Sequence, residues 1–127
     1  TKMKFPSNLK YTKSDEWVDL ESGKMGLTDY AQDQLSDIVF VEALVDVDDD
    51  LEVGGEISSV ESVKASAEVY APAGGTVVAV NEGLADTPEV INSDPYGAGW
   101  LVQVKVSSQS DELMDAAAYE KYCAERD

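Results

Sequence analysis

A lone lysine within an apolar, β-prone stretch is the feature that most constrains this chain. Residues 54–80 read GGEISSVESVKASAEVYAPAGGTVVAV, and the segments 57–63 and 65–71 flank Lys64. Glycine pairs stand near both ends of the stretch, where they indicate turns. The run is as long as two short strands and a tight turn, so the pattern predicts a β-hairpin with Lys64 near the fold-back.

Lys64 is isolated in charge as well as in position. No other Lys or Arg occurs between Met25 and Trp100. A lysine at a hairpin tip presents its amine on a long flexible stem, which suits an enzyme that must reach around it. The small neighbours Ser62 and Ala65 leave room for such an enzyme. We interpret Lys64 as a site of covalent modification; the alternative is an ordinary solvated surface lysine.

The charge balance narrows the choice of partners. The 127 residues include 26 acidic and 9 basic ones, for a net charge of −17. Such a surface repels nucleic acid and anionic membranes, so we expect neither as a partner. It suits docking to partners with basic rims, or else it serves solubility alone. No run of 18 apolar residues exists, so no membrane span is expected.

The residue type most often used as a general base or a metal ligand is missing. The chain has no histidine, which removes the commonest general base and metal ligand, and its single cysteine, Cys123, has no disulfide partner. We expect no catalytic residue and no metal site, and we place Cys123 in a buried or half-buried part of a helix. The Asp-rich run at 46–52 lacks the glycine and terminal glutamate of an EF-hand loop, so it is interpreted as a solvated loop.

The hydrophobic pattern predicts a β-dominated chain in one domain over residues 1–127, with a core over about 11–106. A first hairpin is expected around 10–28 with Trp17 turned inward, followed by a helix that begins near Asp29, which stands at capping-box spacing from Gln32. Later elements are a strand over 38–44 that is apolar except for Glu42, a short buried strand over 76–80, a half-buried strand over 100–106 and a C-terminal helix over about 110–124.

Individual side chains are also assigned to faces. Strict alternation predicts that the series Ala65, Ala67, Val69 and Ala71 faces the core. In the preceding arm Ile57 and Val60 fall on opposite faces, which indicates a bulge or a buried strand. The inward face of the last helix is predicted to consist of Leu113, Met114, Ala117, Ala118 and Tyr122.

Several segments resemble one known family. ESVKA, followed by a strand and AP-x-GG, resembles the lipoyl-lysine segment of the glycine cleavage system H protein family. YTKSDEWV, GLTDYAQDQLSDIVFVE, VNEGL and INSDPYGAGWLVQVK match in the same order, over about residues 11–105, with a similar tail near 119–123. One such motif would be weak, whereas five in order are specific.

The resemblance implies a fold and a cofactor. The fold is an all-β-dominated barrel-sandwich hybrid of the lipoyl/biotinyl type, with short peripheral helices and a C-terminal helix. The cofactor is lipoate, covalently amide-linked to Lys64, and the flanking residues of the modification motif are Glu61, Ser62, Val63 and Ala65.

The resemblance also implies a function without catalysis by the chain itself. A lipoyl carrier shuttles an aminomethyl group from a pyridoxal-phosphate glycine decarboxylase to a tetrahydrofolate-dependent aminomethyltransferase. A dihydrolipoamide dehydrogenase reoxidises it, and a lipoate-attaching enzyme modifies it. We expect a monomer, in the cytoplasm of a bacterium or in a mitochondrial matrix after loss of a transit peptide. The first residues, TKMKFPSN, lack a signal-peptide core, so a leader either never existed or has been removed.

By the same resemblance, Ser14, Glu16 and Glu68 belong to a cleft that shelters the loaded arm. Many relatives carry His where this chain has Asp15, which puts any role of that side chain in doubt.

Four other functions fit parts of the sequence. A biotin carrier shares the fold, but biotin acceptors place Met on both sides of the lysine, whereas Lys64 has Val63 and Ala65. A lipoyl domain of a 2-oxoacid dehydrogenase would have a Pro/Ala-rich linker, and none is present. A stand-alone enzyme would need a nucleophile–base pair or a phosphate-binding loop. Donation of lipoyl groups to other complexes stays open.

Overall fold

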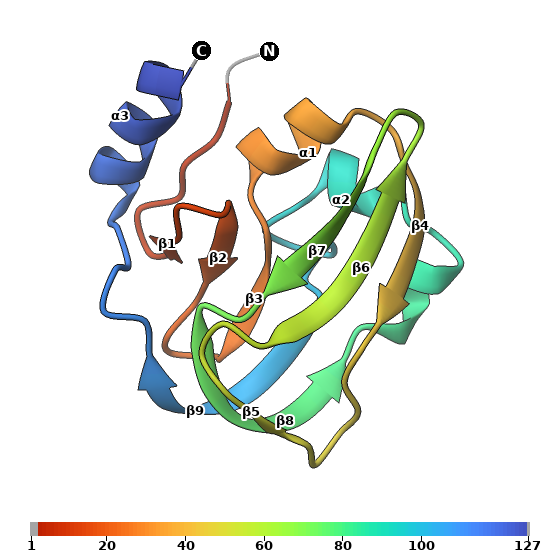
Figure 1. Cartoon of the computed structure of the whole chain (residues 1–127), viewed down its shortest axis with the longest axis vertical. Coiled ribbons are helices and arrows are strands. Elements are labelled where there is room, and N and C mark those ends of the chain that lie inside the picture. Colours follow the sequence, from red (N-terminus) through yellow and green to blue (C-terminus); the bar gives the residue numbers. More distant parts are fainter. Residues whose placement is uncertain (1–2, 127) are drawn as a thin grey trace.

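Two antiparallel sheets form the body of the molecule (Figure 1). The computed structural model describes residues 3–126. The larger sheet has six strands, in the order β1 (Lys10–Tyr11), β2 (Glu16–Val18), β3 (Lys24–Leu27), β9 (Val102–Gln109), β8 (Ala73–Val80) and β5 (Asp50–Leu51). The smaller has three, in the order β4 (Ile38–Ala43), β6 (Glu56–Ser62) and β7 (Ser66–Tyr70). The predicted predominance of β structure is confirmed.

The main core lies between these sheets. Val18 and Val102 of the larger sheet join Val60 and Val69 of the smaller one in a single apolar cluster, and all four side chains are buried. Ile57 and Val60 are both fully buried, and the pairing of β6 with β7 shifts register between Glu56 and Ser58. The predicted bulge in this arm is therefore confirmed, because a shifted register lets two residues of opposite parity face one core.

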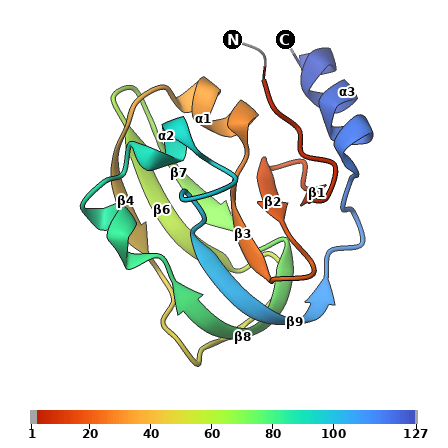
Figure 2. The same cartoon turned by 180° about the vertical axis from the view of Figure 1, so that it is seen from behind.

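Short helices lie at the top and along both sides of the sheets in the view of Figure 2. They are α1 (Asp29–Leu35), the 3-10 helix η1 (Glu82–Ala85), α2 (Val90–Ser93) and α3 (Ala116–Arg126). The helix near Asp29 is found, but its N-cap is Thr28, whose Oγ1 accepts a hydrogen bond from the Ala31 amide at 3.1 Å. Asp29 instead accepts from the side chain of Gln32. None of the helices within residues 3–126 is long and apolar enough to cross a membrane.

The C-terminal helix begins later than the sequence predicts. Met114 exchanges backbone hydrogen bonds with Tyr11, which keeps the chain extended past the predicted start near residue 110. Asp115 then accepts a hydrogen bond from the Ala118 amide, and α3 starts at Ala116. This later start changes the buried face.

The predicted inward face of this helix is therefore wrong in part. Tyr119 and Cys123 are buried, whereas Ala117 and Ala118 are exposed. The burial of Cys123 agrees with the prediction. The ring of Tyr119 stacks on that of Tyr11 with centroids 4.8 Å apart, which joins α3 to β1 in a second, aromatic cluster.

Two apolar strands are less buried than predicted. In β4 the pairing with β6 shifts register between Ile38 and Phe40, and Val39 and Phe40 are 55% and 47% exposed. In β8 the chain alternates, so Val77 is buried and Val78 is 48% exposed. The prediction that the Asp-rich run is a solvated loop is wrong in part: the run forms a turn, with Asp49 accepting a hydrogen bond from the Asp46 amide, and then the short strand β5, in which Leu51 is buried. Residues 3–126 contain no cluster of three or more His, Cys, Asp or Glu side chains suited to a metal ion.

Two glycines with left-handed backbone angles allow a matched test of the fold. Gly23 has φ of +82° and a Cβ there would lie 1.8 Å from the Val104 carbonyl oxygen, whereas Gly54 has φ of +85° and open space around it. Gly54→Ala should cost about 1 kcal/mol from its backbone angle alone. Gly23→Ala adds a clash with backbone and should cost about 3 kcal/mol or more. Urea denaturation measures both, and equal losses would contradict the close approach of Gly23 to the backbone of Val104 in β9.

Candidate cofactor-attachment site and cleft

The turn that carries Lys64 is held by its own hydrogen bonds. The Ser62 amide donates to the Ala65 carbonyl at 2.7 Å, and Ser62 Oγ accepts from the amides of Lys64 and Ala65 at 3.3 and 3.0 Å. The Val63 amide donates to the Asp37 carbonyl, which ties the turn to the segment before β4. The backbone at the tip is thus fixed by Ser62, the residue two positions before the lysine.

The Lys64 side chain is free of such ties. Lys64 is exposed, and Val63 beside it is 64% exposed. Within residues 3–126 the only ion pair joins Arg126 to Asp15, so no carboxylate holds the Lys64 amine. The hairpin projects past the core, which is why Ala65 is exposed, against the prediction that it faces inward. The other three residues predicted to face the core with Ala65 agree better with the prediction: Ala67 is half-buried, and Val69 and Ala71 are buried.

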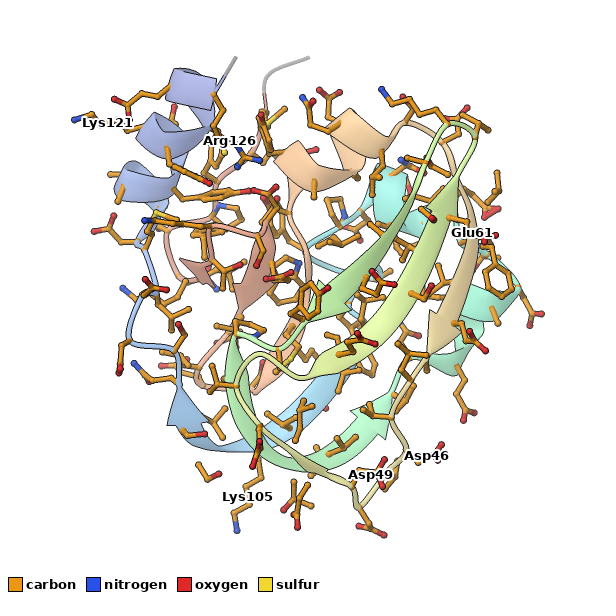
Figure 3. All side chains as sticks on the ribbon, viewed as in Figure 1. Asp46, Asp49, Glu61, Lys105, Lys121 and Arg126 are labelled. Carbon is orange, nitrogen blue, oxygen red and sulfur yellow. The ribbon has the colours of Figure 1, made fainter. Side chains whose placement is uncertain are left out.

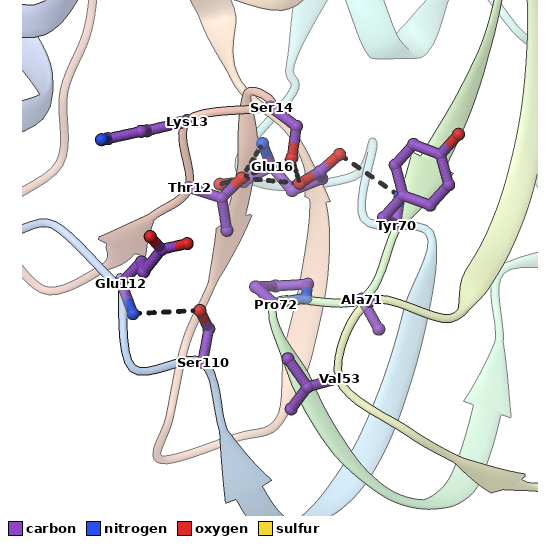
Figure 4. A pocket seen from close by; sticks show the side chains of 11 residues that line it. Thr12, Lys13, Ser14, Glu16, Val53, Tyr70, Ala71, Pro72, Ser110 and Glu112 are labelled. Atoms are coloured by element: carbon purple, nitrogen blue, oxygen red, sulfur yellow. Dashed lines mark hydrogen bonds between the residues drawn. The ribbon is translucent and has the colours of Figure 1, made fainter.

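A cleft of about 440 Å³ lies at the other end of β7 (Figure 4). Its walls come from three parts of the chain that are distant in sequence: the loop before β2, the segments on either side of the β6–β7 hairpin, and the turn after β9. The lining residues are Thr12, Lys13, Ser14, Glu16, Val53, Gly54, Tyr70, Ala71, Pro72, Ser110 and Glu112. Two of the predicted site residues, Ser14 and Glu16, therefore lie together in the cleft.

Glu16 is the buried acid of this cleft. The residue is only 1% exposed, and its carboxylate is satisfied by hydrogen bonds. Oε1 accepts from Thr12 Oγ1 and from Ser14 Oγ, both at 2.6 Å. Oε2 accepts from the Tyr70 amide at 3.2 Å. Burial raises the pKa of Glu16 above its ordinary value, and the hydrogen bonds from Ser14, Thr12 and Tyr70 oppose that rise. A cation in the cleft would favour the charged carboxylate.

Glu68 is not brought into contact with Ser14 or Glu16. It lies exposed on β7, on the same outward side as Ser66 and Tyr70, because alternate residues of a strand share a face. Tyr70 lines the cleft. Glu68 thus stands on the outer surface between the Lys64 turn and the cleft.

Sequence reasoning missed the role of Asp15. Its carboxylate accepts two hydrogen bonds from the Arg126 guanidinium, at 2.7 and 2.8 Å, and one from Tyr119 Oη at 2.8 Å. These contacts fasten α3 to the loop that precedes β2 and carries Ser14 and Asp15. No local signal could have revealed them, because Asp15 and Arg126 are 111 positions apart.

A mostly β, two-sheet fold with an exposed lysine at a hairpin tip is the architecture of lipoyl and biotinyl carrier domains. The family model described as glycine cleavage H-protein matches residues 9–126. The chain therefore belongs to the glycine cleavage H-protein family, and its role lies in the glycine cleavage system. This agrees with the family resemblance read from the sequence.

Named relatives support the assignment. The glycine cleavage system H protein of Syntrophomonas wolfei is 50% identical over 125 residues, which cover 95% of each chain. That of Psychrobacter cryohalolentis is 53% identical over 120 residues, covering 91% of this chain and 94% of the relative. The crystal structure of a glycine cleavage system H protein from Mycobacterium marinum superposes with a TM-score of 0.86 at 35% identity, covering 94% of this chain and 98% of that one. The predicted barrel-sandwich architecture agrees with this likeness.

The buried acid makes stability depend on pH in a definite direction. Because the folded-state pKa of Glu16 is raised, the folded protein binds this proton more tightly than the unfolded chain does. The Glu16 contribution to stability is therefore lost as pH rises from the ordinary carboxyl range through the raised pKa. Glu16→Gln removes this loss, so the stability of the variant relative to wild type should improve as pH rises.

Urea denaturation of both proteins from about pH 5 to pH 8 measures this difference. Glu112→Gln, which removes an exposed carboxylate from the same cleft, controls for the change in net charge. Parallel pH profiles for Glu16→Gln and wild type would contradict the assignment.

Proposed function

We propose that this chain is the lipoyl carrier of the glycine cleavage system, with lipoate attached to Lys64 through an amide. The observation that carries the proposal is the exposed Lys64 amine on a hydrogen-bonded turn. Amide formation removes the charge of the lysine. Since no carboxylate within residues 3–126 pairs with Lys64, that loss leaves no buried or paired anion behind.

Bound lipoate supplies a disulfide that accepts a one-carbon amine unit and is later reoxidised. The chain supplies attachment and positioning, and no residue of it acts as a catalyst. The proposed partners are a pyridoxal-phosphate glycine decarboxylase, a tetrahydrofolate-dependent aminomethyltransferase, a dihydrolipoamide dehydrogenase and a lipoate-attaching enzyme. Because the named relatives are bacterial, we propose that these meet in the cytoplasm.

The distances along β7 suit this role. The lysine side chain and the lipoyl chain together contain about eleven single bonds, which extend to roughly 14 Å. At about 3.3 Å per residue, Glu68 lies roughly 13 Å from Lys64 and Tyr70 roughly 20 Å. The attached cofactor therefore reaches Glu68. The opened and loaded arm is longer by about five bonds, through two ring carbons, a sulfur, the methylene and the nitrogen, and this added length of roughly 6 Å brings the ammonium to the mouth of the cleft at Tyr70.

The cleft offers a place for the ammonium of the cargo. Glu16 is a buried carboxylate whose charge is disfavoured by burial, so a cation bound beside it gains from pairing. Ser14 Oγ donates a hydrogen bond to Oε1 of Glu16, and Ser14 lines the same cleft. We assign Ser14 and Glu16 to binding the ammonium and limiting the access of water, and Glu68 to attracting it along the outer face of β7.

Substitution of the attachment residue tests the proposal directly. The protein is incubated with lipoate, ATP and a lipoate–protein ligase, and intact mass and peptide mapping are recorded. Wild type and the control Lys105→Arg, at another exposed lysine, should gain one lipoyl group on the Lys64 peptide. Lys64→Arg should gain none, with an unfolding free energy within about 0.5 kcal/mol of wild type. A lipoyl group on any other residue would refute the attachment site.

The role of Glu68 has its own matched control. Glu42 and Glu68 flank Ser59 from opposite sides on the same sheet face, and both are exposed. Glu68→Gln should speed the loss of ammonia from the loaded carrier severalfold, because one carboxylate that attracts the ammonium is removed. Glu42→Gln should leave that rate unchanged. Ammonia release is measured in the absence of the aminomethyltransferase. Equal rates in both variants would contradict the proposal that Glu68 attracts the ammonium.

A further inference from the structure

An exposed apolar cluster adjoins the attachment turn. It consists of Val39 and Phe40 of β4 and Val63 of the turn, and we call it the β4 patch. These side chains are 55%, 47% and 64% exposed. Phe40 lies opposite Glu61 in the β4–β6 pair, and the Val63 amide is bound to the Asp37 carbonyl just before β4. Strand β4 and the Lys64 turn therefore present one continuous surface.

A bulge creates this patch. Strict alternation from the buried Ile38 would turn Phe40 toward the core and Val41 outward. The register shift at Val39 reverses this, so that Val39 and Phe40 both face solvent and Val41 is buried. Exposed apolar residues on an edge strand promote unwanted association, and bulges often re-aim side chains at functional sites. The patch is therefore better explained by a partner than by packing.

The charges around the patch indicate the chemistry of that partner. Asp37, Glu42 and Glu61 are exposed around it, and Figure 3 shows Glu61 at the right-hand side of the molecule, beside β4. Lys64 is the only basic residue between positions 25 and 100. A complementary surface would thus combine an apolar socket with a basic rim.

We propose that the β4 patch docks the lipoate-attaching enzyme, an inference that rests on the proposed function. That enzyme must bring an activated lipoyl group to Nζ of Lys64 itself. With a lipoyl adenylate, Nζ forms the C–N bond, the C–O bond to phosphate breaks, AMP leaves and the amine gives up a proton. Enzymes that act on the far end of the cofactor work roughly 14 Å away. Only the attaching enzyme is compelled to cover the residues beside Lys64.

A pair of double variants with closely matched exposure tests this. Val39→Thr/Phe40→Thr replaces two residues of the patch. Val47→Thr/Val78→Thr replaces residues that are 53% and 48% exposed, one in the turn between Asp46 and Asp49 at the opposite end of the molecule (Figure 3) and one on β8. Initial rates of lipoyl attachment are measured by intact mass, at carrier concentrations below and above KM and at two ionic strengths.

The patch variant should lose about tenfold in kcat/KM through a higher KM, as expected when an interface hot spot is removed. The control should stay within about twofold of wild type. Added salt should slow the reaction of wild type, because it screens the attraction between Asp37, Glu42 and Glu61 and a basic rim on the enzyme. An unchanged rate in the patch variant, or an equal loss in the control, would overturn the proposal. If the patch double variant does not fold, Val39→Thr against Val78→Thr takes its place.

Two further outcomes distinguish failure of this inference from failure of the proposed function on which it rests. If wild type itself gains no lipoyl group, the proposed function fails, whatever the variants do. If attachment is normal in the patch variant but its fully loaded form reacts more slowly with glycine decarboxylase, the patch belongs to that enzyme and the proposal is wrong.

Discussion

The hydrogen bonds of Glu16 join the two sheets at the point where the cleft forms. Glu16 belongs to β2 of the larger sheet. Its Oε2 accepts a hydrogen bond from the amide of Tyr70, at the end of β7 in the smaller sheet. Its other oxygen gathers the hydroxyls of Thr12 and Ser14. A buried carboxylate with three donors fixes the loop before β2 against β7, since leaving any of them unpaired would be costly. Glu16 therefore holds two walls of the cleft, the loop before β2 and the end of β7, in fixed relative positions.

Two further constraints place the candidate site around that acid. On one side, the Asp15–Arg126 pair and the Tyr11–Tyr119 stack hold α3 against the loop that carries Ser14. On the other, β7 runs from the cleft to the Lys64 turn as a strand of known rise per residue. The spacing between Lys64 and the cleft is thus set by strand geometry.

Local patterns predicted the parts of this arrangement that depend on neighbouring residues. The Lys64 hairpin, the inward Trp17, the bulge near Ile57 and the buried Cys123 all followed from spacing and residue type. Contacts between distant segments were not predicted. The bridge between Tyr11 and Met114 delayed α3, and no periodicity in residues 111–115 announces it.

The site was predictable to a similar extent. Ser14 and Glu16 came from family resemblance, and the structure places them side by side; the same resemblance gave no indication that Asp15 holds Arg126. For β4, the apolar run from Ile38 to Val41 carries no alternation of polar and apolar residues, so the sequence could not tell which of these residues face out. The bulge at Val39 decides that, and it depends on pairing with β6.

The proposed function requires that cargo carried at Lys64 reach the Glu16 cleft. The most direct measurement is NMR of the loaded carrier, with the one-carbon unit derived from glycine labelled with carbon-13. Nuclear Overhauser contacts from the labelled methylene to Ser14 and to the Tyr70 amide, with the slow tumbling of the whole protein, are the predicted result. A labelled carbon that shows no such contacts and moves as freely as a solvated chain would contradict the account.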